Sequence, residues 1–158
     1  MKNKNYNQKG IAMVEILVAV SIMAVAFIAI MAVAQKSIYL ARQGLHQSQS
    51  AFLLEEGAEA VRIVRDGAWS DISSLSTSTD YYPLFSGGTW ILTQTPATIG
   101  IFSRKVTVAS VYRNGSDDIA GSGTLDTGTK FVTVTISWQE GGQTLSKILS
   151  FYLSDIFS

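Results

Sequence analysis

The chain contains no cysteine and a single histidine among its 158 residues. Without cysteine it has neither a disulfide nor a thiolate metal ligand, so an exported domain must rely on its packed core. The histidine, His46, lacks the further His or Cys ligands that a transition metal requires, and we expect a solvated helix residue there. We therefore predict a protein that is not an enzyme and binds no cofactor.

A surplus of basic side chains is also absent. The formal net charge is zero, with 12 basic and 12 acidic groups, and no basic patch indicates nucleic-acid binding. The first ten residues hold Lys2, Lys4 and Lys9 but no acid. Because lysine and arginine are enriched on the cytoplasmic side of membrane spans, this leader is predicted to stay in the cytoplasm and the rest of the chain to face outward.

A long apolar run follows the leader. Every residue from Ile16 to Ala34 is apolar or small, and Ser21 is the only hydroxyl. At about 1.5 Å per residue, such a helix nearly covers the hydrocarbon core of about 30 Å. The run exceeds the roughly 7–15 apolar residues of a secretory signal and lacks the usual cleavage site behind it. We predict a single transmembrane helix over residues 11–34, in the cytoplasmic (inner) membrane and in contact with its lipid.

One carboxylate, Glu15, lies at the start of this run. An ionisable side chain within a span costs roughly 2.5–3.5 kcal/mol on insertion scales, and it calls for a partner and a function. A plain signal anchor would explain the span and the lysines of the leader. It gives no reason for Glu15.

Residues 9–15, KGIAMVE, resemble the start of type IV pilins and pseudopilins. Precursors in this family carry a short basic leader ending in glycine, and glutamate is the fifth residue of the hydrophobic helix that follows. The resemblance implies that a prepilin peptidase cuts between Gly10 and Ile11 and then N-methylates Ile11. It also implies other pilin or pseudopilin subunits, an assembly platform membrane protein and, indirectly, an assembly ATPase as partners. Ile11 and Ala12 stand where phenylalanine and threonine are common in the family.

Charge compensation gives a physical reason for a glutamate at this position. Cleavage after Gly10 would leave a cationic amine on Ile11, and parallel helices in a filament can place one subunit's Glu15 beside another subunit's amine. Either charge alone would be costly to bury, whereas the pair sets axial register more surely than it adds stability.

The helical pattern continues beyond the span. Residues 35–66 are predicted to form an amphipathic continuation of one helix over residues 11–66, which ends at Asp66-Gly67 because glycine suits a helix C-terminus. Gly44 and Gly57 lie inside it, as points either of bending or of close helix packing. The apolar stripe is expected to contain Ile38, Ala41, Leu45, Phe52, Leu54, Ala58 and Val61.

The rest of the chain predicts a loop over residues 70–88 and then a small antiparallel sheet. Aromatic and β-branched residues favour strands at 89–95, 103–113, 130–139 and 143–154, with a hairpin connection at 140–142. The expected fold is α+β, a long N-terminal helix packed on a small antiparallel sheet, and it resembles the pilin plan. The predicted parts are a leader (1–10), a transmembrane helix (11–34), an amphipathic helix (35–66) and a loop-plus-sheet domain (67–158).

The last two predicted strands look like the ending of minor pilins of the PilV type and of minor pseudopilins of type II secretion. Two amphipathic strands that close a core explain the same pattern. The C-terminal disulfide of many major pilins is absent because the chain has no cysteine, which favours a minor subunit.

The loop over residues 114–128 offers Asp117, Asp118 and Asp126 as oxygen ligands of the kind that calcium uses, without EF-hand spacing. An ordinary polar hairpin loop is the alternative. Taken together, the sequence predicts a structural subunit of a type IV pilus or a type II secretion pseudopilus, forming a cell-surface or periplasmic filament. The alternative is a single-pass, membrane-anchored binding module that does not polymerise.

Overall fold

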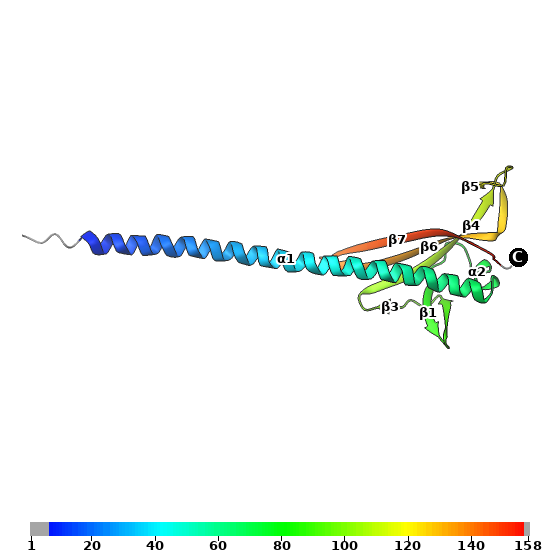
Figure 1. Cartoon of the computed structure of the whole chain (residues 1–158), viewed down its shortest axis with the longest axis horizontal. Helices are drawn as coiled ribbons and strands as arrows, with labels where there is room; N and C mark the ends of the chain where they lie inside the picture. Colours follow the sequence, from blue (N-terminus) through cyan, green and yellow to red (C-terminus); the bar gives the residue numbers. More distant parts are fainter. Residues whose placement is uncertain (1–6, 157–158) are drawn as a thin grey trace, which may run out of the picture. The chain divides into compact units, whose positions relative to one another are not determined.

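The computed structural model describes residues 7–156, with side chains from Ile11 onward. It confirms the α+β class, with one long helix followed by antiparallel sheets (Figure 1). Lys2 and Lys4 of the predicted leader lie outside the described residues. The elements are α1 (Asn7–Gly67), α2 (Ser70–Ser73), β1 (Tyr82–Ser86), β2 (Thr89–Thr93), β3 (Thr98–Ile99), β4 (Phe102–Arg113), β5 (Ile119–Ala120), β6 (Thr124–Glu140) and β7 (Gln143–Ser154).

The chain divides after Leu45 into two compact units. In the first unit, α1 is long and apolar enough to cross a membrane, and its apolar side chains are exposed. The hydroxyl of Ser21 donates to the Leu17 carbonyl at 2.7 Å, and that of Ser37 to the Val33 carbonyl at 2.9 Å. Both hydroxyls are therefore satisfied within the helix, as an apolar surrounding requires.

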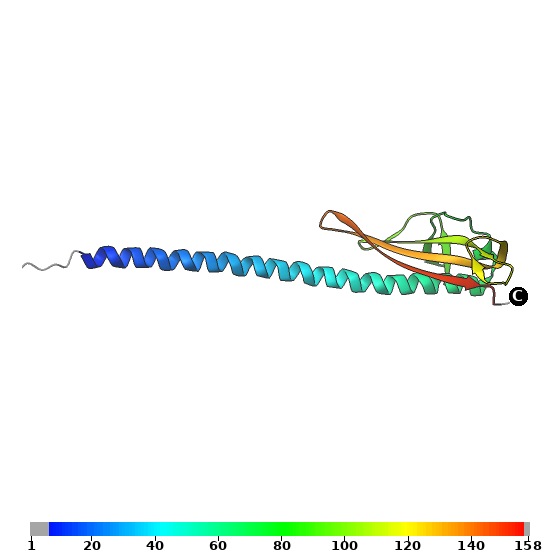
Figure 2. The same ribbon diagram turned by 90° about the horizontal axis from the view of Figure 1, so that it is seen from above.

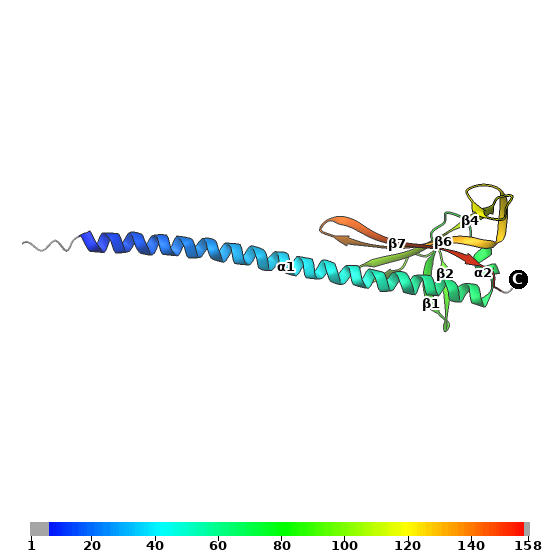
Figure 3. The same ribbon diagram turned by 45° about the horizontal axis from the view of Figure 1, so that its top comes forward.

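The second unit contains the sheets. The main sheet has the order β3-β4-β6-β7, with β5 paired to β4, and all its neighbours are antiparallel. The pair β1–β2 forms a separate two-stranded sheet. Figure 3 shows β4, β6 and β7 on the same side of the C-terminal part of α1. The pairing of β4 with β6 has a register shift between Ser110 and Val111. In Figure 1, the end of β4 that pairs with β5 turns away from the helix.

The core of this unit is built from alternate residues of the strands and from helix residues spaced three or four apart. Alternate residues of β4 and β6 face inward because side chains on a strand point to opposite faces in turn. The helix contributes residues spaced three or four apart, so that one stripe meets the sheet. Figure 2 shows the strands lying along this part of the helix. The buried core residues are Leu54, Ala58, Val61, Val64, Ile72, Phe102, Val106, Val108, Val132, Val134, Ile136, Trp138 and Leu153.

Part of the predicted stripe was wrong. Phe52 is 70% exposed, because two residues along an α-helix turn the side chain by about 200° away from buried Leu54. Ile38 and Leu45, in the first unit, are also exposed. The stripe that enters the core therefore begins at Leu54.

The predicted loop over residues 70–88 contains α2 and β1, and the short strands β3 and β5 were not predicted. β2 ends at Thr93, two residues before its predicted end, and β6 begins at Thr124, six residues before its predicted start. The strand predicted at residues 143–154 matches β7, and α1 ends one residue beyond the predicted Asp66.

Gly57 is a point of close helix packing. A Cβ atom on Gly57 would lie 2.8 Å from Cγ1 of Val134 and 3.0 Å from Cδ of Arg104, whereas a Cβ on Gly44 would meet nothing within 4 Å. Of the two interpretations left open for Gly57, the structure supports the close approach of helix and sheet.

Gly57→Ala is expected to lower the melting temperature of the second unit. Overpacking against Val134 costs about 1–3 kcal/mol, which outweighs a helix-propensity gain of at most about 1 kcal/mol. The fall in Tm should be a few degrees, roughly 4–8 °C per kcal/mol. Tryptophan fluorescence of the full chain in detergent measures it, because all three tryptophans follow residue 67. Gly44→Ala is the matched control and should not lower Tm; equal effects of the two variants would refute the packing role.

Candidate functional site

The candidate site in the first unit is Glu15 and its surroundings on α1. The peptide bond between Gly10 and Ile11, the predicted cleavage point, lies in the first turns of this helix. Ile11 precedes Glu15 by four residues, which is about one helical turn, so both lie on one face. An amine created at Ile11 would therefore lie close to a carboxylate of its own chain as well as being available to a neighbour.

The face around Glu15 is otherwise apolar. Positions three, four and seven residues away on a helix share a face. From Ile11 onward these positions hold only aliphatic side chains, all of them exposed, namely Ile11, Ala12, Val18, Ala19 and Ile22. Glu15 is thus a lone carboxylate on an exposed apolar surface of the helix.

The chain itself offers Glu15 no partner within residues 11–45. The next charged residue is Lys36, 21 positions further along, about 32 Å away at about 1.5 Å per residue. Across the described part of the chain, no ion pair involves Glu15. Within residues 11–45, Glu15 therefore has no cation close enough to pair with it.

The three candidate calcium ligands surround an arginine. Nε of Arg113 donates to Oδ2 of Asp126 at 2.7 Å, and it lies 3.7 Å from Oδ1 of Asp117. Asp118 is exposed. The other oxygen of Asp126, Oδ1, accepts a hydrogen bond from the Gly128 amide at 2.9 Å. The guanidinium thus stands where a cation would have to bind.

The pairing of Arg113 with Asp126 also shifts the pKa values of both groups. The hydrogen bond from Arg113, together with those from Thr129 and the Gly128 amide, lowers the pKa of Asp126, and the same bond raises the pKa of Arg113. Among residues 7–156 there is no group of three or more His, Cys, Asp or Glu side chains placed to hold a metal ion. The geometry is that of an ion-paired hairpin.

His46 is not the solvated residue that the sequence predicted. It is half-buried, its ring packs edge-on against Phe102 with centroids 6.1 Å apart, and its Nδ1 lies 3.6 Å from Oε2 of Glu140. The same Glu140 oxygen accepts a hydrogen bond from Nε1 of Trp138 at 3.0 Å. The prediction failed because the hairpin between β6 and β7 brings Glu140 to the helix, a contact about 90 residues away in sequence.

A buried arginine escaped the sequence interpretation. Arg104 is 3% exposed, its Nη1 lies 3.2 Å from Oε1 of Glu56, and its guanidinium carbon lies 5.2 Å from the ring centroid of Trp90. The signal for it is the alternation of β4, which gives Arg104 the same inward parity as Phe102 and Val106. Its contacts tie α1 and β2 to the sheet, which is a structural role.

Asp126→Asn is expected to destabilise the second unit at neutral pH. Because the folded pKa of Asp126 is below its ordinary value of 3.8, its ionised form is favoured by folding. This stabilisation is fully present above the ordinary pKa and disappears as the pH falls through the folded pKa. The Tm of the variant should be about 2–5 °C lower at pH 7, and the difference should close as the pH falls below about 4.

Asp118→Asn is the matched control, since it changes an exposed carboxylate of the same hairpin and should shift Tm far less. Millimolar calcium should leave the Tm of the unaltered chain unchanged. A calcium-dependent rise in Tm that Asp126→Asn abolishes would contradict the ion-paired hairpin.

No protein-family model matches the chain, and no curated protein or solved structure shows significant similarity to it. Its function therefore has to be inferred from its own residues and their physical chemistry.

Proposed function

We propose that this chain is a structural subunit, a minor pilin or a pseudopilin, of a type IV pilus or a type II secretion pseudopilus. The observation that carries the proposal is Glu15, the one acid in residues 11–45, five positions after Gly10 on a helix that is long and apolar enough to cross a membrane. A lipid anchor has no use for this carboxylate, whereas a filament of parallel helices can use it to set the axial register of its subunits.

The energetics favour pairing between chains. An ion pair buried in a low-dielectric helix bundle becomes strongly destabilising once one partner is removed, by about 3–5 kcal/mol. Subunits that place Glu15 beside a terminal amine are therefore favoured over subunits shifted along the helix axis. The carboxylate thus selects one axial register among many that the uniform apolar surface would accept.

The remaining steps follow from this role. A prepilin peptidase removes residues 1–10 on the cytoplasmic side and methylates the amine of Ile11. Before assembly the subunit is held in the inner membrane as a single-pass protein with the second unit outside. A platform membrane protein, driven indirectly by an ATPase, transfers it to the filament at the cell surface or in the periplasm, and the second unit meets partners there.

The first test is intact-mass and N-terminal peptide mass spectrometry of the protein from native membranes, with and without a prepilin peptidase. The expected mature chain begins at Ile11, carries an added methyl group, and is found only when the peptidase is present. A chain that begins at Met1 under both conditions would instead support the non-polymerising, membrane-anchored binding module.

The second test is Glu15→Ala. Fibre yield, measured as sheared protein per cell, should fall at least about tenfold, because one partner of a buried pair is lost. Extraction with alkaline carbonate should show membrane insertion unchanged. Glu59→Ala is the matched control, since that acid pairs with exposed Arg62 at 3.1 Å on the surface of the second unit. Normal fibre yield from Glu15→Ala would disprove the register role.

A further inference from the structure

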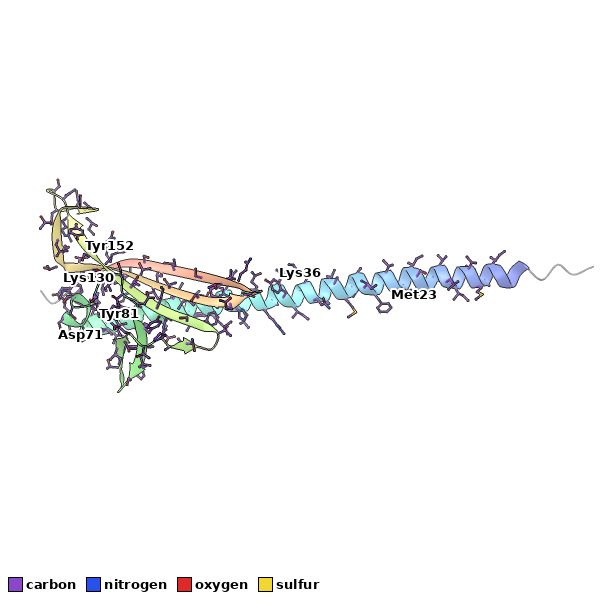
Figure 4. The ribbon with its side chains drawn as sticks, turned by 180° about the vertical axis from the view of Figure 1, so that it is seen from behind. Met23, Lys36, Asp71, Tyr81, Lys130 and Tyr152 are labelled. Atoms are coloured by element: carbon purple, nitrogen blue, oxygen red, sulfur yellow. The ribbon has the colours of Figure 1, made fainter. Side chains whose placement is uncertain are left out.

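A basic and aromatic stripe lies where the apolar run of α1 ends. Lys36, Tyr39 and Arg42 are all exposed, and they are spaced three residues apart, so they follow one another along one side of the helix. Nζ of Lys36 lies 5.2 Å from the ring centroid of Tyr39, over its face. Figure 4 labels Lys36 on this part of the helix.

The two cations of this stripe have no acid near them in the first unit. Between Glu15 and Glu55 the sequence contains no Asp or Glu. Glu15, the one acid of residues 11–45, lies about 32 Å from Lys36 along the helix. Within residues 11–45, no acid therefore lies close enough to neutralise Lys36 or Arg42.

Exposed apolar side chains lie next to these residues on the same segment. Ile38, Ala41 and Leu45 recur at spacings of three and four residues, and Ile38 and Leu45 are 57% and 56% exposed. Ile38 and Leu45 lie four residues before and three residues after Arg42, so they share its face of the helix. Residues 35–45 thus mix basic and aromatic side chains with exposed apolar ones, the composition favoured where a helix crosses a membrane–water interface.

We propose that Lys36, Tyr39 and Arg42 bind the headgroups of anionic phospholipids at the outer surface of the membrane and so fix the depth of the span. Lys36 and Arg42 donate to headgroup phosphate oxygens, and the Tyr39 ring lies at the interface, where tyrosine is favoured. The inference rests on the membrane insertion of the proposed function, and it requires neither cleavage nor polymerisation.

The length of the uncharged stretch of α1 determines where Glu15 lies when Lys36 is at the outer interface. Residues 16–35 contain no charged side chain, and at about 1.5 Å per residue these 20 residues cover about 30 Å, one hydrocarbon thickness. With Lys36 held at the outer interface, Glu15 reaches the inner interface, where water and headgroups solvate it. The stripe therefore acts as a stop that keeps Glu15 out of the hydrocarbon.

The test uses the full chain in vesicles of phosphatidylcholine containing one quarter phosphatidylglycerol. Because the chain has no cysteine, a single Gln35→Cys change carries an environment-sensitive fluorophore, and quenching by brominated lipids gives its depth. Lys36→Gln/Arg42→Gln should displace the label along the membrane normal by about one helical turn, roughly 5 Å. Arg62→Gln/Lys130→Gln removes two charges from the second unit and should leave the label where it was.

Each alternative outcome is decisive. An unchanged depth in Lys36→Gln/Arg42→Gln would overturn the stripe alone. A displacement of the same size in vesicles of pure phosphatidylcholine would overturn the preference for anionic headgroups. A fluorophore on Met23→Cys reports insertion separately, and its failure to reach the bilayer centre would overturn both this inference and the membrane-inserted subunit.

Discussion

The uncompensated carboxylate of Glu15 constrains the first unit more than any other group. The helix around it satisfies its own backbone and both of its serine hydroxyls, so the acid is the one polar group of the apolar stretch that is left to another molecule. This stretch of the helix is therefore fully hydrogen-bonded, but its one carboxylate has no nearby cation within residues 11–45. The proposed function depends on what supplies the opposite charge.

The second unit is held together by its core. That core closes around Val61, Val106 and Val134, each fully buried; the buried Arg104 lies beside Glu56 and Trp90, while its Nε makes no hydrogen bond. Gly57 permits the short distance between helix and sheet on which this packing depends. Because folding of this unit already uses the apolar side chains from Leu54 onward, the exposed apolar residues before Leu45 are not required for it. They remain available to lipid or to other helices.

The sequence predicts the parts of the fold that carry strong local patterns. The end of α1 follows from a glycine stop, and the start of β7 from the glycine-rich hairpin connection at residues 140–142. The helix α2 is a single turn, and β3 and β5 are two residues long, so none of them carries a readable period. Phe52 was misplaced because its hydrophobicity was weighed without its angle to Leu54. His46 was misjudged because its partner Glu140 is distant in sequence. Glu15 was recognisable because one charge in an apolar run needs no tertiary information.

The charge pattern of α1 links the proposed membrane and filament states. In the membrane, the stretch without charge between Glu15 and Lys36 matches the hydrocarbon core, so both charged ends are solvated by headgroups and water. Leaving the membrane removes the lipid phosphates from Lys36 and Arg42 and carries Glu15 through the hydrocarbon, where an unpaired acid is costly. An amine one turn away on Ile11 lowers that cost, because the two charges can travel as a pair. Removal of residues 1–10 would thus prepare the subunit both for extraction and for its register in the fibre.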